Sequence, residues 1–176
     1  MENKIAINVN LVKRGVVVDN IFCGLYRVKK ETTSHLFFEC RIAWFVWNPC
    51  YAWLGLKSVD NLVYASHFLK FNLFGPLTSV NLVFGSVWIA LVSEIWRHRN
   101  KHILKGGVID HLEIFSMAQL KVWYWVTFKV PSACFSFLDW CLDPLVCMFS
   151  IKNKWLVISW SSVCFAICEG MSSLLC

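Results

Sequence analysis

Two cysteines and one histidine near the start of the chain have a spacing that could hold a metal ion. They are Cys23, His35 and Cys40, within the stretch "FCGLYRVKKETTSHLFFEC" at residues 22–40. A structural zinc site needs four thiolate or imidazole ligands in a tetrahedron, and a C-x2-C turn often supplies two of them. Here Tyr26 occupies the place where the second cysteine of such a turn would be. From the spacing alone, the group is either a zinc site that lacks one ligand or a chance cluster in a cysteine-rich chain.

The fourth ligand is the part of the site that the sequence does not supply. The phenol of Tyr26 is a poor zinc ligand near neutral pH because its ordinary pKa is about 10. Three ligands can hold zinc with water in the fourth place, as in catalytic sites, but no general base lies in an evident position. Cys50 comes after a helix of about three turns, so we do not expect it to complete the set. We therefore expect zinc to be bound weakly or lost.

Helices are expected to position these residues. Residues 4–14 carry apolar side chains at helical spacing, and a loop is expected over 16–33 because it is rich in turn residues. A second helix is predicted to begin at Thr33 or Ser34, either of which can cap it, and to end near residue 47. Pro49 suits the first turn of a further helical segment that Gly55 ends.

Three more helices are predicted further along the chain. Residues 60–72 give a weak and ambiguous helical pattern, whereas residues 78–104 give the longest one. The next helix has the clearest start, because Asp110 precedes Glu113 by three residues, close to a capping box, and it should run to about residue 129. No regular pattern follows. The sequence predicts a mainly α fold with a small knuckle-like loop at one end and an irregular apolar tail.

The catalytic motifs of common enzyme classes are missing. Polymerase chemistry of the reverse-transcriptase kind needs clustered carboxylates for two metal ions. The aspartates are scattered instead, with no adjacent acidic pair: Asp19, Asp60, Asp110, Asp139 and Asp143. The phosphate-binding loop, the G-x-S-x-G elbow and the H-E-x-x-H zinc motif are also absent. We expect a protein that is not an enzyme.

The charge of the chain suits two kinds of partner without proving either, and it could instead be ordinary solubilising charge. Hydrophobic residues make up 57% of the 176 residues and charged residues 16%, and the net charge is +6. A mild positive excess suits nucleic acid or an acidic membrane surface. The nine cysteines are an odd number, and the start "MENKIAINVN" does not resemble a secretory signal. We expect reduced cysteines in an intracellular protein of the nucleus or cytoplasm, not a secreted one.

A membrane-associated protein is the alternative. Residues 71–93 contain no charged residue, and about 20 apolar residues can span a bilayer. This run includes Gly75, Pro76 and several other polar or small residues, and its uniformly apolar part is nearer 14 residues, a length more often found in a buried helix. A membrane partner is thus disfavoured without being excluded.

Residues 10–47 resemble a known zinc-binding domain. The stretch contains, in order, Arg14-Gly15, Cys23, Glu31-Thr32, His35-Leu36-Phe37, Cys40, Trp44 and Trp47. This order is similar to the domain that follows the polymerase in reverse-transcriptase proteins of plant non-LTR retrotransposons. The later segment 87–107 shares the likeness through Trp88, Trp96, Arg99 and Asn100. The family has a cysteine where Tyr26 stands, so this chain looks like a degenerate copy.

The resemblance implies zinc held by Cys23, His35 and Cys40, and contact with RNA or DNA beside the polymerase part of a retroelement protein. Basic residues crowd the loop and its flanks, and such residues can bind phosphate: Lys13, Arg14, Arg27, Lys29, Lys30 and Arg41. The same residues could instead be a solvated surface. We expect a degenerate zinc-binding motif over 1–56, a helical region over 57–130 and an irregular tail over 131–176.

Overall fold

The computed structural model is mainly α-helical, as the sequence predicts. It describes residues 5–57, 64–73, 78–130 and 133–151. These residues form α1 (Asn8–Lys13), the π-helical turn η1 (His35–Glu39), α2 (Arg41–Trp53), α3 (Tyr64–Leu73), α4 (Thr78–Lys105), α5 (His111–Lys129), α6 (Phe137–Leu142) and α7 (Pro144–Ser150). Within them, the only strand-like pairing is an isolated antiparallel bridge between Phe22 and Lys30.

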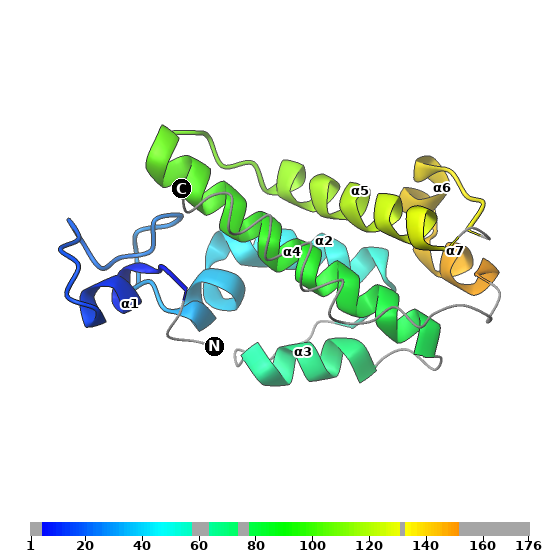
Figure 1. The fold of residues 1–176 in the computed structure, drawn as a ribbon, viewed down its shortest axis with the longest axis horizontal. Helices are drawn as coiled ribbons and strands as arrows, with labels where there is room; N and C mark the ends of the chain where they lie inside the picture. The colour runs from blue at the N-terminus through cyan, green and yellow to red at the C-terminus, as the bar shows by residue number, and fades with distance from the viewer. Residues whose placement is uncertain (1–4, 58–63, 74–77, 131–132, 152–176) are drawn as a thin grey trace.

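Helix α4 is the axis on which the other elements pack. Figure 1 shows it running the length of the molecule, with α5 returning along one side, α3 along the other, and α2 behind. Its predicted span of 78–104 agrees with the structure to within one residue. Helix α1 and the loop after it lie beside the C-terminal end of α4. The basic end of α4 therefore faces the cysteine-containing loop.

Aromatic side chains form the centre of the core. The ring of His67 on α3 lies 4.6 Å from those of both Phe38 and Trp47, measured between ring centroids. The indole of Trp88 on α4 donates a hydrogen bond to His67. Phe71 packs against Trp47 edge to face. Elements from both ends of the described chain thus share one hydrophobic core.

Helix α5 begins as the sequence predicts. The carboxylate of Asp110 accepts hydrogen bonds from the backbone N–H groups of Leu112 and Glu113, which would otherwise lack partners in the first turn. The helix is fixed to α4 by a buried carboxylate, Glu94, which pairs with Arg97 on its own helix and with Lys121 on α5. This ion pairing accounts for charged residues within an otherwise apolar helix pair.

Two expectations for the helices were wrong. The helix expected over 33–47 is interrupted at Cys40, and α2 then continues through Pro49 instead of restarting there. Residues 137–150, expected to be irregular, form α6 and α7. The signals were short-range caps: Ser136 and Asp139 form a capping box, and Asp143 caps the helix that follows. These helices are too short to show a periodic pattern.

Two predicted segments lie outside the described residues. They are the tail beyond residue 151 and the residues near 60, where a weak helix was expected to begin. In the described ranges, no helix has both the length and the apolar composition to cross a membrane.

Candidate metal centre

The three predicted ligands come together in the structure. Cys23, His35 and Cys40 are all buried, and each offers a ligand atom within 4.8 Å of those of the other two. The two sulfur atoms are 3.8 Å apart. Two thiolates bound tetrahedrally at about 2.3 Å from zinc would lie roughly 3.8 Å apart, whereas a disulfide would need about 2 Å. The separation therefore fits two ligands of one metal ion.

A short hairpin-like loop places Cys23. Its backbone N–H donates to the carbonyl of Lys29 at 2.8 Å, and the N–H of Arg27 donates to the Cys23 carbonyl at 2.8 Å. The bridge between Phe22 and Lys30 closes the loop behind it. Arg27 lies in the left-handed region with a φ of 54°, a conformation that costs a non-glycine residue about 1 kcal/mol or more. The loop thus turns tightly around the sulfur.

A π-helical turn brings His35 and Cys40 to the same side. The N–H of Cys40 donates to the carbonyl of His35, five residues earlier, at 2.7 Å. In an α-helix, residues five apart point about 140° away from each other, because each residue turns the chain by about 100°. The wider π turn reduces that angle, so both side chains reach the metal position. Turns of this kind are frequent at functional sites. Helical periodicity alone does not predict it.

The two thiol groups are joined by a hydrogen bond between their sulfur atoms. The hydrogen bond with Cys40 lowers the pKa of Cys23 to about 6, helped by the backbone N–H groups of Leu25 and Tyr26 and by His35, against the opposing effect of burial. The hydrogen bond with Cys23, burial and the charge on Cys23 raise the pKa of Cys40. Cys23 is therefore the thiol that ionises first. The backbone N–H groups that act on this sulfur stabilise its charged form, which is the form that binds a metal ion.

Cys40 sits at the start of α2. The backbone N–H groups of Ile42 and Ala43, in the first turn of that helix, act to lower its pKa. Free N–H groups at a helix N-terminus favour negative charge. A cation at the centre of the cluster would remove the repulsion that keeps Cys40 protonated, so that both cysteines could bind as thiolates.

His35 fits a metal ligand better than a packed core residue. Its side chain is buried, yet neither ring nitrogen has a hydrogen-bond partner among the described residues. Leaving a buried polar group unpaired costs about 1–3 kcal/mol. Metal coordination would satisfy one of these nitrogens. The set of two soft thiolates and one imidazole suits zinc.

Tyr26 does not take part in the cluster. Its side chain is 39% exposed, and its hydroxyl accepts a hydrogen bond from Arg41 at 3.0 Å. The Arg41 guanidinium also lies 5.7 Å from the centre of the tyrosine ring. Cys50 is buried on α2 outside the cluster, and burial alone raises the pKa of its thiol above the ordinary range. Within the described residues, the cluster therefore offers three candidate ligands.

The six basic residues predicted to contact nucleic acid are all exposed: Lys13, Arg14, Arg27, Lys29, Lys30 and Arg41. The surroundings of these residues differ. Lys13 is in the last turn of α1, and Arg41 is held between the rings of Tyr26 and Phe45. Phe37 and Phe38, on the turn beside the loop, are buried in the core. Exposure is compatible with phosphate contact and equally with a solvated surface.

Sequence reasoning missed a second group next to the metal cluster. Glu31 is fully buried in the loop, and its carboxylate accepts hydrogen bonds from the backbone N–H groups of Asn8 and Gly24 and an ion pair from Arg99. Neither residue was predicted to belong to a site, and no pairing between them was expected. The signal was present, because both Glu31 and Arg99 belong to the residues that carry the family likeness.

Comparison with known proteins supports the likeness at the N-terminal end. Residues 1–47 match the family model described as zinc-binding in reverse transcriptase. The match contains Cys23, His35 and Cys40, and it ends well before α4. No curated protein and no solved structure matches the chain.

Proposed function

We propose that this chain, whose residues 1–47 match a model of the zinc-binding domain of reverse transcriptases, binds one zinc ion through Cys23, His35 and Cys40 and contacts nucleic acid. The observation that carries the proposal is the convergence of two sulfurs and an imidazole in a buried cluster. When bound, zinc would neutralise the two thiolates and fix the loop to η1 and α2.

The proposed role is structural and not catalytic. The matching family is a zinc-binding domain, and no general base stands beside the cluster in the sequence. The loop and its flanks present cations, which supports contact with the phosphates of RNA or DNA. The polymerase part of a retroelement protein is the proposed neighbour, and the nucleus or cytoplasm the proposed location.

The division of the chain into a motif at 1–56, a helical region at 57–130 and a tail at 131–176 belongs to the same proposal. We propose that the first two parts act together, because Arg99 on α4 holds Glu31 in the loop. According to this proposal, the conformation of the zinc motif depends on its contact with α4. Loss of the fourth ligand at Tyr26 would weaken metal binding without dispersing the other three.

Two measurements on the purified chain test the proposal. Metal analysis by mass spectrometry should find one zinc per chain, and a chelator should remove it more readily than from a four-ligand site. Fluorescence anisotropy with labelled single-stranded RNA and DNA should show binding that weakens steeply with salt, because phosphate contacts release counterions. A chain that takes up no zinc overturns the metal assignment. Binding to neither nucleic acid at 50 mM salt overturns the proposed partner.

A further inference from the structure

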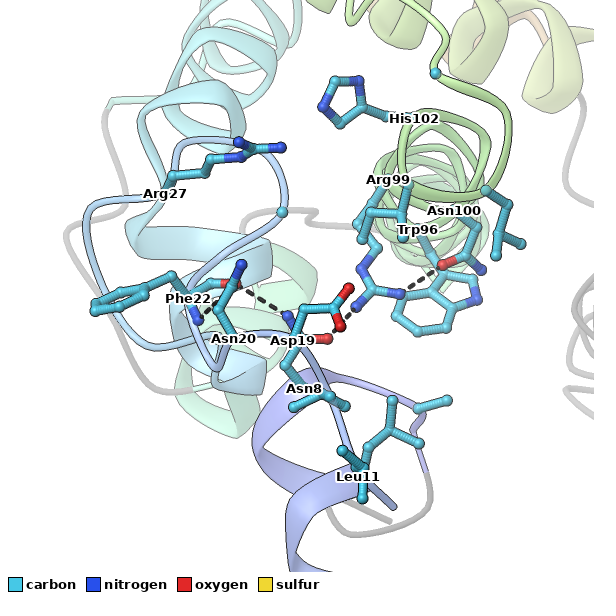
Figure 2. Close-up of a pocket in the computed structure, with 17 residues that line it drawn as sticks. Asn8, Leu11, Asp19, Asn20, Phe22, Arg27, Trp96, Arg99, Asn100 and His102 are labelled. Atoms are coloured by element: carbon cyan, nitrogen blue, oxygen red, sulfur yellow. Dashed lines mark hydrogen bonds between the residues drawn. The ribbon is translucent and has the colours of Figure 1, made fainter.

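A cavity of about 670 Å³ lies beside the metal cluster and shares no side chain with it. It is formed by α1, the loop after it, the turn at Gly24 and the last turns of α4. Figure 2 shows its wall, with Arg27 and His102 pointing toward one another at one end and Asp19 and Asn20 further along. Gly24 lets α4 come close, because a Cβ there would lie 2.5 Å from the end of the Ile103 side chain.

Several polar groups in this wall have hydrogen-bonding capacity that the described residues do not use. The guanidinium of Arg27 and the carboxylate of Asp19 have no hydrogen bond or ion pair in the described ranges. Nδ1 of His102 is bonded to the carbonyl of Gly107 at 2.6 Å, so Nε2 is the ring nitrogen left for a ligand. Asn20 accepts the N–H of Phe22 with its oxygen, which leaves its amide N–H groups.

The rest of the wall is apolar or already neutralised. Leu11, Trp96 and Ile103 supply apolar surface. Arg99 also lines the cavity, but Glu31 balances its charge. The two charges in this wall without an ion pair among the described residues are therefore those of Arg27, at one end, and Asp19, further along, and both border the same cavity as the apolar side chains. A ligand that fits has an anionic group, a flat apolar ring and a polar edge with N–H donors.

We propose that this cavity binds one nucleotide of a single-stranded nucleic acid, with the phosphate on Arg27 and the base against the apolar wall. The edge of the base would face Asp19 and Asn20. This inference rests on the proposed function and gives it a site. The faces and Watson–Crick edges of bases are accessible in single strands and not in a duplex, and aromatic or apolar side chains stack on the faces. The exposed Lys29 and Lys30, close to Arg27 in the chain, would meet the neighbouring phosphates.

Two variants remove different features of the cavity. Arg27→Gly deletes the guanidinium and suits a φ of 54°, so it should fold at least as well as the wild type. Its matched control is Lys57→Gln, which removes one exposed charge away from the cavity. Leu11→Trp fills the cavity without changing charge, and Leu112→Trp is its control, at a position that is 58% exposed on α5.

The experiment is fluorescence anisotropy of zinc-loaded protein with a labelled 12-nucleotide single-stranded RNA and its DNA equivalent, over a range of salt. We expect both cavity variants to bind about fivefold more weakly or worse, and both controls to stay within twofold of the wild type. Arg27→Gly should also lower the salt slope by about 0.7, the value for one phosphate contact on a single strand. Thermal melting of each variant checks that it is folded.

The outcomes separate the site from the proposed function. If the wild type binds but either cavity variant matches its control, nucleic acid binds elsewhere and this inference is wrong while the proposed function stands. If the wild type binds no single strand, both are wrong. Free uridine monophosphate should compete at least a hundredfold less well than the oligonucleotide. Equal competition would assign the cavity to free nucleotides and overturn the single-strand proposal.

Discussion

The guanidinium of Arg99 on α4 pairs with the carboxylate of Glu31, 68 residues earlier in the loop, and both side chains are buried. Glu31 also accepts the N–H of Asn8 at the start of α1 and the N–H of Gly24, the residue next to Cys23. A helix outside the matched segment 1–47 therefore holds the turn that carries Cys23, one of the three proposed metal ligands. The carboxylate joins three parts of the chain at one point.

We predict that Glu31→Gln destabilises the fold by about 3–5 kcal/mol, because it leaves Arg99 as an uncompensated buried charge. The measurement is urea unfolding followed by tryptophan fluorescence. Glu113→Gln is the matched control, since Glu113 is 46% exposed beside His98 and should change stability by less than about 1 kcal/mol. Equal effects of the two substitutions would show that the buried pair does not stabilise the loop.

The helical part of the fold could be predicted because long elements carry repeated signals. Helix α4 spans 28 residues and α5 spans 19, long enough for a helical pattern to agree with the Gly106-Gly107 stop after α4 and the Asp110 cap before α5. The sequence placed the π turn η1 inside a longer ordinary helix, and it missed α6 and α7, whose six and seven residues show no clear apolar spacing. The starts of α6 and α7 depend instead on the side-chain caps at Ser136 and Asp143.

The metal cluster could be predicted in part. Residue types and spacing identified Cys23, His35 and Cys40, because ligands near in sequence can converge in a single loop and turn. The pairing of Glu31 with Arg99 depends on tertiary packing over 68 residues, which one sequence does not report. The two residues were noticed separately as parts of one likeness. Only the structure shows that they contact each other.

Tyr26→Cys should raise zinc affinity about a hundredfold. Four ligands share roughly 10–16 kcal/mol of binding free energy, so one added thiolate contributes about 3 kcal/mol. The backbone N–H of Tyr26 already acts on Cys23, which places residue 26 next to that ligand. Competition with a fluorescent zinc chelator measures the change. Tyr26→Phe is the control: it loses the hydrogen bond from Arg41 but adds no ligand. If Tyr26→Cys binds zinc no more tightly than Tyr26→Phe, residue 26 does not occupy the place of the fourth ligand.

The substitution His35→Leu should stabilise the metal-free chain and destabilise the zinc-bound chain, each compared with the wild type. Without metal, both ring nitrogens of His35 are buried and unpaired, so leucine should stabilise the chain by about 1–3 kcal/mol. With zinc, the wild type gains binding energy that the variant lacks, and the order reverses. Thermal melting with excess chelator and with one equivalent of zinc measures both states. His111→Leu, at a half-buried position outside the cluster, should show no reversal. The same order in both conditions would mean that His35 is a core residue.

Stability should fall in acid through His67. Trp88 donates to its Nδ1 at 2.9 Å, so Nε2 carries the proton and donates to the Tyr51 hydroxyl at 2.7 Å. Burial lowers the pKa of His67 from 6.5 to about 4. The unfolded chain then binds a proton between these values that the folded chain does not, so stability falls as the pH drops through this window. Above pH 6.5 the residue is neutral in both states and has no effect.

The size of this loss follows from the shift, at about 1.4 kcal/mol for each pH unit, or roughly 3 kcal/mol between pH 6.5 and 4. The chain holds other ionisable groups. The test therefore compares the acid-induced loss of stability of a variant with that of the wild type. The stability of His67→Gln, measured by urea unfolding at pH 7 and pH 4.5, should drop less than that of the wild type by about 2–3 kcal/mol. His111→Gln should keep the full drop, because it leaves the buried ring in place. If His67→Gln loses as much stability in acid as the wild type, His67 is protonated in the folded core, and its bonds to Trp88 and Tyr51 are not those of a neutral ring.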